Sequence, residues 1–356
     1  MTSSEIIRLR LCNQQLAATK CTKPQDVVSW MGAMQAQDYR MAKWAIGLRL
    51  MASDDTIVEK AFNEGKILRT HVLRPTWHFV TPQDIRWMLD LTAPRVLSSL
   101  AHNDRHLALD KKVLKKTNDV LSKALEGGKQ LTRDEVKVEL QRARIDTSGL
   151  RFLHLLEHAE LDRIICSGPR KEKQFTYALF DDRASSKIME RDEALAELTK
   201  RFFTSRGPAT VFDFAWWSGL SVAHAKKGIE MVKGNFKKER IDGKECFFRV
   251  PSSFKNETAQ TVLLLPNYDE YVVSYKDRKE AIDKKHLAVI ATERNAVFTN
   301  SILINGKIEG TWKREIKNDS VAVTTRPFSA LSKAKQKLVD TAADRYCKFL
   351  GKPLRE

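Results

Sequence analysis

The sequence predicts a mainly helical fold with small β hairpins, an α+β chain divided into several compact units. Capping boxes, in which Ser or Thr precedes Glu, Gln or Asp by three residues, mark the starts of several helices. Glycine-containing turns separate short alternating runs, which indicates hairpins. Strand-like runs replace helical periodicity after about residue 260. With 356 residues, 42% of them hydrophobic, the chain has enough apolar material for about two to four packed units.

The first unit is expected over residues 1–128, with helices on both sides of one hairpin. Capping boxes at Thr2 and Thr22 start its first two helices. A hairpin follows over residues 67–80, and Gly127-Gly128 marks the end of the unit. The other helices are expected at 41–50, 56–63, 82–91, 94–107 and 111–125.

Two further units, 129–187 and 188–255, repeat one order of elements: a helix, a tight turn, a second helix and a hairpin. In the later unit a capping box at Thr210 starts the first helix, Gly219 ends it, and Asp242-Gly243 turns the hairpin. This order is typical of a winged helix-turn-helix, and the first unit is a longer version of it. The sequence therefore predicts three tandem winged helix-turn-helix units.

The last unit, residues 256–356, is expected to be a mixed α/β unit in which Asn305-Gly306 is the strongest hairpin signal of the chain. A closing helix from Leu331 to Phe349 has apolar residues at helical spacing and is expected to dock onto the strands. Those strands are expected at 261–265, 271–275, 297–304, 307–312 and 320–325.

The chain is strongly basic, with 62 Lys and Arg against 45 Asp and Glu and a net charge of +17. Such a surface attracts polyanions, most commonly nucleic acid. The sequence shows no signal peptide, lipidation motif or apolar run of membrane-spanning length, so we expect no membrane partner and a cytoplasmic, nucleoid-associated protein. Five dispersed cysteines without a C-x-x-C pair fit a reducing compartment.

Common catalytic signatures are missing from the sequence. It has no H-E-x-x-H, G-x-S-x-G, Walker glycine loop or dinucleotide fingerprint. His154 and His158 are four residues apart on an expected helix, but a third metal ligand is not near them in sequence. We therefore expect no metal and no cofactor, and no lysine stands out as a Schiff-base nucleophile.

The segment Gln35-Ala36-Gln37, named the Gln motif here, is a candidate for chemistry. Residues two apart on a helix point about 200° apart and cannot serve one site together. If both amides act, the chain must leave helical geometry there, and in an extended conformation the two would face one way. The alternative is that a Gln-x-Gln pair is ordinary surface polarity.

The hairpin beside the Gln motif is rich in cations and polar groups. In its second strand Thr76 and His78 share one face and Trp77 and Phe79 the other, so one face is expected in the core and the polar face toward solvent or DNA. A structural wing whose histidines cap buried backbone groups is the alternative. The residues expected at phosphates are Arg69, His71, Arg74, Thr76 and His78 here, Arg170 and Lys171 in a second wing, and Lys226 and Lys227 on a later helix.

Several short motifs in one order resemble a known family. They are Gln35-Ala36-Gln37, Arg74-Pro75-Thr76-Trp77-His78, Gly207-Pro208-Ala209-Thr210, Asp213-Phe214-Ala215-Trp216-Trp217-Ser218-Gly219, Leu265-Pro266-Asn267-Tyr268-Asp269-Glu270-Tyr271 with Arg278, and Gly310-Thr311-Trp312. Together they resemble the AlkZ/YcaQ family of bacterial winged-helix DNA glycosylases over nearly the whole chain. With glutamine at both ends of the Gln motif, the chain resembles the AlkZ-like branch.

The resemblance implies a C-shaped arrangement around a DNA channel and excision of N-alkylated purines, including interstrand crosslinks in some members. It assigns catalysis to Gln35 and Gln37, and it implies a C-terminal hairpin that reaches the duplex, where we expect Trp312 and Lys313 to contact DNA. The chemistry is reasonable in its own terms: an alkylated purine is cationic and leaves as a neutral base, so positioning a water and stabilising a sugar cation suffice. Amides can orient that water.

Other polar residues near these motifs have competing interpretations. Asp38 is a rival general base, although an ion pair with Arg40 would give it a structural role, which we favour. Asp269 and Arg278 are expected in a buried organising network. Trp216-Trp217 is expected in the core of the third helix-turn-helix.

The sequence thus predicts a monofunctional DNA glycosylase, active as a monomer on double-stranded DNA with alkylated bases. The alternative is a non-enzymatic winged-helix DNA-binding protein, either a transcriptional regulator or a damage binder that has lost activity, because winged helices are more often readers than catalysts. Tandem units weaken the regulator interpretation, since many regulators carry one unit per subunit and dimerise.

Overall fold

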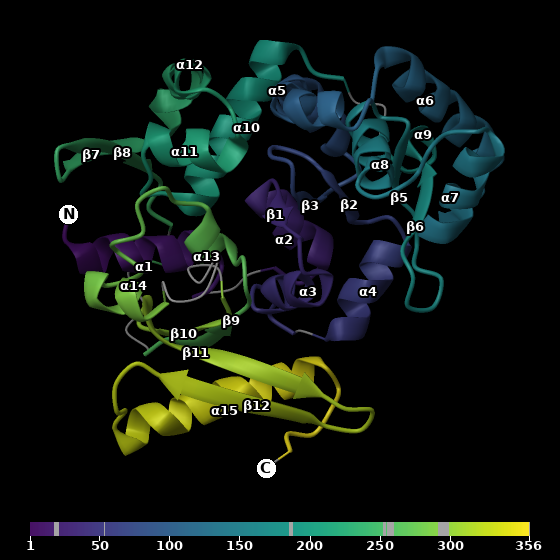
Figure 1. Ribbon diagram of the computed structural model, residues 1–356. Helices are drawn as coiled ribbons and strands as arrows, with labels where there is room; N and C mark the ends of the chain where they lie inside the picture. The colour runs from purple at the N-terminus through teal and green to yellow at the C-terminus, as the bar shows by residue number, and fades with distance from the viewer. Residues whose placement is uncertain are drawn as a thin grey trace.

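The computed structural model describes residues 1–17, 21–52, 54–184, 188–251, 254, 260–290 and 299–355. It is an α+β fold in which the strand pairs between named strands are antiparallel, as the sequence predicted. Figure 1 shows residues 24–80 near the middle, residues 111–183 and 191–248 in two flanking groups, and the strands and closing helix of residues 307–349 at the bottom.

The N-terminal segment combines six helices with one three-stranded sheet of order β1-β3-β2. The expected helix break before Pro94 is wrong, because α5 continues through that proline. The elements are α1 (Ser3–Asn13), α2 (Pro24–Met31), β1 (Met34–Gln35), α3 (Tyr39–Gly47), α4 (Asp55–Asn63), β2 (Leu68–His71), β3 (Trp77–Val80), α5 (Ile85–His106) and α6 (Lys111–Leu125).

Local capping explains where several helices begin. Thr2, Thr132 and Thr210 each accept a hydrogen bond from the main-chain N–H three residues on, and the acidic residue there bonds back to the cap, which confirms three predicted capping boxes. The box expected at Thr22 is wrong, because α2 begins at Pro24 with Lys23 as its N-cap and no side-chain cap bond.

The next two segments repeat the pattern of the first. In each of the three segments, two helices precede a pair of antiparallel strands. A short strand earlier in the segment pairs with the second strand of that pair; in the third segment a single bridge between Ala209 and Phe247 takes the place of this short strand. The order matches that expected of winged helices, and their assignment as DNA-reading units stays an interpretation. The elements are β4 (Leu131–Thr132), α7 (Arg133–Arg142), α8 (Arg151–Leu161), β5 (Ile165–Ser167), β6 (Thr176–Leu179), α9 (Phe180–Arg183), α10 (Arg191–Arg206), α11 (Val211–Ser218), α12 (Val222–Val232), a 3₁₀ turn η1 (Lys233–Asn235), β7 (Lys237–Ile241) and β8 (Lys244–Phe248).

The C-terminal part contains a four-stranded sheet of order β12-β11-β10-β9. Asn305 and Gly306 turn the β10–β11 hairpin with φ of 50° and 78°, as the sequence predicted. The strand expected at 271–275 is wrong: these residues begin in a short helix, because Asp269 caps the N–H of Tyr271. The elements are β9 (Val262–Leu265), α13 (Glu270–Val273), α14 (Lys284–Ile290), β10 (Ser301–Ile304), β11 (Lys307–Ile316), β12 (Val321–Pro327) and α15 (Lys333–Phe349).

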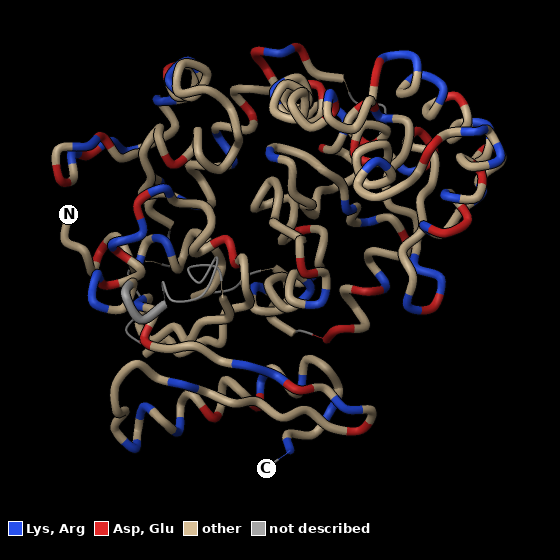
Figure 2. The backbone as a smooth tube through the Cα atoms, in the orientation of Figure 1, with Lys and Arg blue, Asp and Glu red and all other residues tan. Residues whose placement is uncertain are grey.

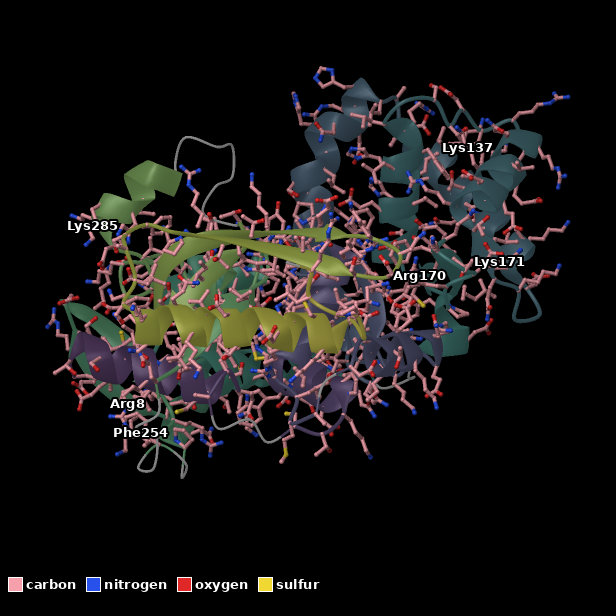
Figure 3. The ribbon with its side chains drawn as sticks, turned by 90° about the horizontal axis from the view of Figure 1, so that it is seen from below. Arg8, Lys137, Arg170, Lys171, Phe254 and Lys285 are labelled. Atoms are coloured by element: carbon pink, nitrogen blue, oxygen red, sulfur yellow. The ribbon has the colours of Figure 1, made fainter. Side chains whose placement is uncertain are left out.

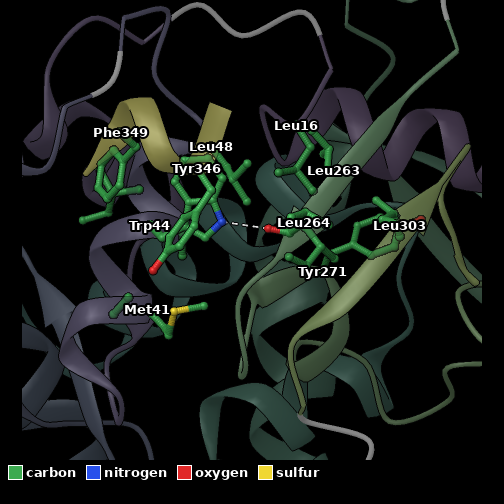
Figure 4. Close-up of a cluster of buried hydrophobic side chains, with 14 of the residues drawn as sticks. Leu16, Met41, Trp44, Leu48, Leu263, Leu264, Tyr271, Leu303, Tyr346 and Phe349 are labelled. Atoms are coloured by element: carbon green, nitrogen blue, oxygen red, sulfur yellow. Dashed lines mark hydrogen bonds between the residues drawn. The ribbon is translucent and has the colours of Figure 1, made fainter. Parts of the chain in front are cut away.

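One apolar core joins the N-terminal helices to the C-terminal sheet and α15. Trp44 on α3 lies 5.2 Å from Tyr346 and 5.1 Å from Phe349 between ring centroids, and its Nε1 donates to Leu264 O at 2.7 Å (Figure 4). The closing helix therefore docks onto the strands and also fixes α3, which follows the Gln motif.

The division of the chain at 128, 187 and 255 stays a prediction. Within the described residues, no helix combines the length and apolar character needed to cross a membrane.

Candidate active site

The Gln motif lies where the chain leaves one helix and enters the next. Helix α2 ends at Met31, Gly32 follows with a φ of 74°, and Gln35 then pairs with His78 in the β1–β3 ladder. Ala36 N donates to Trp77 O at 2.7 Å. The motif is therefore not helical, which is the condition that both amides require if they serve one site.

Side-chain burial alternates along the motif as an extended backbone requires. Ala36 is fully buried, Gln35 is half-buried and Gln37 is exposed. Ala36 thus packs inward while the two glutamines lie on the opposite side of the backbone. Their catalytic role stays a prediction.

Two charged side chains hold Gln35 from opposite ends. The Glu270 carboxylate accepts from the Gln35 main-chain N–H, with 2.8 Å between N and Oε1. Arg74, at the turn between β2 and β3, places Nη2 3.1 Å from Gln35 Oε1. Both the backbone and the amide of Gln35 are therefore fixed.

Arg69 on β2 fixes the end of the motif. Its Nε donates to Ala36 O at 3.0 Å and its Nη2 to Gln37 O at 3.5 Å. Its guanidinium lies 4.3 Å from the Trp77 ring centroid and 4.9 Å from that of Phe175. Burial lowers the pKa of Arg69 to about 10, so it stays a cation at neutral pH.

A buried ion pair lies beneath Gln35. Glu270 Oε2 accepts from Arg206 Nη2 at 2.7 Å, from Trp217 Nε1 at 3.0 Å and from Ser274 Oγ at 2.7 Å. Burial alone would raise the pKa of Glu270, but the Arg206 guanidinium and these donors lower it to about 2. The carboxylate is therefore ionised and holds α10, α11 and β1 together.

A second buried ion pair corrects the expected partner of Asp269. Its carboxylate accepts two hydrogen bonds from Arg49, both at 2.8 Å, with both side chains fully buried. Arg278 instead donates from Nε to Val272 O at 3.0 Å. The sequence does contain a signal for Arg49, because it stands between two leucines in the mostly apolar run 44–50, where a buried charge requires a partner.

Asp38 follows the motif and caps α3. Its Oδ1 accepts from Met41 N at 3.2 Å, and its Oδ2 lies 3.6 Å from Arg314 Nη2 and 3.5 Å from Asn267 Nδ2. The ion-pair partner is therefore Arg314 on β11, whereas the sequence suggested Arg40. These contacts support the structural role that we favoured for Asp38.

Comparison with known proteins identifies the family. Residues 28–349 match the family model described as DNA glycosylase AlkZ-like. The chain belongs to the AlkZ-like DNA glycosylase family. This confirms the resemblance seen in the sequence.

A curated protein sequence and a solved structure, both from Streptomyces sahachiroi, are similar to this chain. The protein named interstrand DNA cross-link repair glycosylase is 22% identical over 365 residues, which cover 98% of this chain and 96% of that protein. The solved structure of the DNA glycosylase AlkZ covers 100% of this chain and 99% of its own, with a TM-score of 0.81 at 21% identity. The structural match shows a shared fold.

In this AlkZ-like chain, the polar face of the motif hairpin (β2 and β3) is buried, which corrects the expected orientation. His78 is fully buried, and its Nδ1 lies 2.8 Å from Thr76 O. Burial and the nearby Arg74 lower its pKa to about 3, so His78 is a neutral imidazole at physiological pH. Thr76 Oγ1 is also buried, so neither side chain is placed to contact phosphate.

His71 lies on the opposite face of the same hairpin and is buried too. Its Nδ1 is 2.7 Å from Glu160 Oε2, and its ring lies 4.5 Å from that of Trp77. Burial lowers the pKa of His71, but the Glu160 carboxylate outweighs it and the net pKa is raised. His71 therefore joins the hairpin to α8 and is not available to phosphate.

Of the two residues predicted to contact DNA from the C-terminal hairpin, one is buried and one is exposed. Trp312 is 1% exposed, and its Nε1 donates to Leu265 O at 2.8 Å, so the expectation that it contacts DNA is wrong. Lys313, the next residue on β11, is exposed because neighbouring side chains of a strand point to opposite faces. Of this pair, Lys313 stays a predicted DNA contact.

The remaining residues predicted to contact DNA are basic side chains that differ in exposure and in their pairing with acidic residues. Figure 3 labels Arg170 and Lys171. Arg170 pairs with Glu59 at 3.3 Å and packs over Tyr39, so it joins the wing loop to α4. Lys171 is exposed and lies 3.5 Å from Glu135. Lys226 and Lys227 are exposed on α12, and Lys227 pairs with Asp192 at 2.6 Å. Figure 2 shows Lys and Arg positions distributed along many segments of the chain.

Two tryptophans in α11 differ in environment. Trp217 is fully buried, as expected, whereas Trp216 is 42% exposed and donates from Nε1 to Val273 O at 2.9 Å. The expected core position of Trp216 is therefore wrong.

Within the described residues, neither a metal cluster nor the cavity beside α1 and α11 coincides with the Gln motif. The described residues contain no group of three His, Cys, Asp or Glu placed to hold a metal; His154 and His158 both lie near Asp104 at 3.7 and 3.0 Å. A cavity of about 590 Å³ lies between α1, α11 and the loop after α13, and no residue of the motif lines it.

Proposed function

We propose that this chain is a monofunctional DNA glycosylase that hydrolyses the N-glycosidic bond of N-alkylated purines, such as N7-alkylguanine and N3-alkyladenine. The observation that carries the proposal is the Gln motif of an AlkZ-like family member, held out of helical geometry by Arg69, Arg74 and Glu270. Fixing the backbone of the motif and the amide of Gln35 before the substrate binds reduces the reorganisation that the reaction requires.

The reaction matches the chemistry that amides can perform. Alkylation makes the purine cationic, so the electron pair of the bond between N9 and C1′ leaves with the base, which becomes neutral. Water then adds to C1′ of the sugar and loses its proton to solvent. Gln35 and Gln37 orient that water through hydrogen bonds and need not remove its proton in advance. Neutral unmodified bases are expected to be poor substrates.

The substrate is proposed to be double-stranded DNA bound by a single copy of the chain. The net charge of +17 supports binding to a polyanion. The relative named interstrand DNA cross-link repair glycosylase supports crosslinked alkylpurines as a further substrate class.

The test is excision from a duplex that carries one N7-methylguanine, read as alkali-labile abasic sites. Wild type is expected to excise, and Gln35→Ala and Gln37→Ala are expected to lose activity by on the order of 100-fold, as for other positioned polar groups. Gln130→Ala is the matched control, because Gln130 is an exposed glutamine before β4.

Three outcomes would count against the proposal. Full excision by the double variant would remove the mechanism. Tight binding without excision by wild type would favour a damage binder, and equal affinity for alkylated and unmodified DNA would favour a regulator.

A further inference from the structure

Arg74 is built into the motif hairpin in a way that a surface phosphate contact does not require. It is half-buried at the turn, where its main-chain N–H donates to Val72 O and its carbonyl accepts from Thr76 N, both at 2.7 Å. The turn packs against Gly219, where an added Cβ would lie 2.2 Å from Leu73 O. The close approach of Gly219 therefore buries Arg74 beside Gln35.

The contact between Arg74 and Gln35 sets the orientation of the amide. A guanidinium carries only donors, so the atom of Gln35 at 3.1 Å from Nη2 must be the carbonyl oxygen. The amide is planar, and Nε2 therefore points away from Arg74. Gln35 is left with two N–H donors, while one lone pair of its oxygen is already used.

The side-chain amide of Gln37, unlike that of Gln35, is not held in one orientation. Arg69 bonds only its main-chain carbonyl, and its exposed amide has no hydrogen bond to any side chain or main-chain group that the structure describes. Its carbonyl oxygen can therefore turn to accept from a water molecule.

The groups around Arg74 act on its charge in opposite directions. Burial lowers the pKa of Arg74, the Glu270 carboxylate on the main-chain side of Gln35 raises it, and the guanidinium groups of Arg206 and Arg278 lower it further, so the net pKa is lowered. His78 pairs with Gln35 across the strands and is neutral. Because a guanidinium group is not deprotonated in proteins, Arg74 still donates to Gln35 at neutral pH.

We propose that Arg74 is a positioning residue that fixes the Gln35 amide, so that Gln35 acts as a hydrogen-bond donor and Gln37 as the acceptor for the attacking water. The inference rests on the proposed glycosylase function. It differs from the sequence-based expectation that Arg74 contacts a DNA phosphate.

A double-mutant cycle between Arg74→Gln and Gln35→Ala tests whether the two residues act together. The rate is measured in single-turnover excision with enzyme in saturating excess, on the N7-methylguanine duplex. Arg74→Gln is expected to slow excision by about 10-fold to 100-fold, because a mispositioned group costs rate at saturation. In the Gln35→Ala background the same change is expected to alter the rate by less than about 2-fold.

Binding measurements separate positioning from phosphate contact. Affinity for a duplex with a stable abasic-site analogue is measured at several salt concentrations. Arg74→Gln is expected to leave the salt slope unchanged, as is Lys115→Gln, which removes an exposed cation from α6 as a charge-matched control. Arg74→Lys keeps one charged donor and is expected to recover part of the lost rate.

Each contrary result has a defined meaning. A normal saturated rate with weaker binding and a salt slope smaller by about one would make Arg74 a phosphate contact. Multiplicative effects of the two substitutions would show that Arg74 does not act through Gln35. If Arg74→Gln unfolds, a rate for Arg74→Lys equal to wild type with an altered salt slope overturns the proposal. Wild-type binding without excision refutes the proposed function itself, whereas an active wild type with an uncoupled cycle refutes only the positioning role.

Discussion

Replacing Glu270 with glutamine is expected to destabilise the whole protein. The carboxylate is 1% exposed and accepts hydrogen bonds from Arg206, Trp217, Ser274 and the main chain of Gln35. Glutamine has almost the same shape, but its NH₂ group would face donors, and Arg206 would be a fully buried charge without a compensating anion. Breaking such a pair from one side costs about 3–5 kcal/mol of unfolding free energy.

The pKa of Glu270 gives a second estimate of how much stability the Glu270 carboxylate contributes. A decrease from an ordinary value of 4.5 to about 2 corresponds to about 3 kcal/mol of stability at neutral pH. Because the pKa is lowered on folding, this stabilisation is present above pH 4.5 and is lost as the pH falls toward 2. Glu270→Gln should therefore lose stability at pH 7 and show a weaker decline between these two pH values than wild type.

Urea unfolding at pH 7 and at several acidic pH values measures both effects. Glu230→Gln is the matched control, because Glu230 forms an exposed ion pair with Lys233 at 2.5 Å, which is worth at most about 1 kcal/mol. A loss of less than about 1 kcal/mol for Glu270→Gln would show that the network beneath Gln35 does not hold the fold together.

Three further predictions follow from the corrected environments. Trp312→Ala is expected to lower the unfolding free energy by about 3–5 kcal/mol, because the ring is buried; weaker DNA binding at unchanged thermal stability would contradict this. Arg170→Gln is expected to cost about 1 kcal/mol and to leave the salt slope of DNA binding unchanged, whereas Lys313→Gln should reduce that slope by about one. The pKa of His71, followed by NMR, should lie above 6.5 in wild type and below 6.5 in Glu160→Gln. The contribution of His71 to stability is present below pH 6.5 and is lost as the pH rises through the raised pKa. An unchanged pKa of His71 in the variant would refute the pairing with Glu160.

The sequence by itself determined the local features of this protein. Capping boxes at Thr2, Thr132 and Thr210 and the Asn305-Gly306 turn depend on hydrogen bonds and backbone angles within a few residues, and the structure confirms all of them. The angle between neighbouring side chains showed that both amides of the Gln motif can serve one site only outside a helix, and the structure meets that condition. Family membership was visible because short motifs occur in a fixed order along the chain.

Tertiary structure alone decided which charges are paired and which faces are buried. Arg49 and Asp269 are 220 residues apart, and no local rule selects that partner over Arg278. The polar face of the motif hairpin carries Thr76 and His78, and period-2 alternation could not show that Glu270, Arg206 and Arg74 create a polar interior for it. Burial and pairing depend on packing between distant segments, so the support of the Gln motif emerges only when those segments meet.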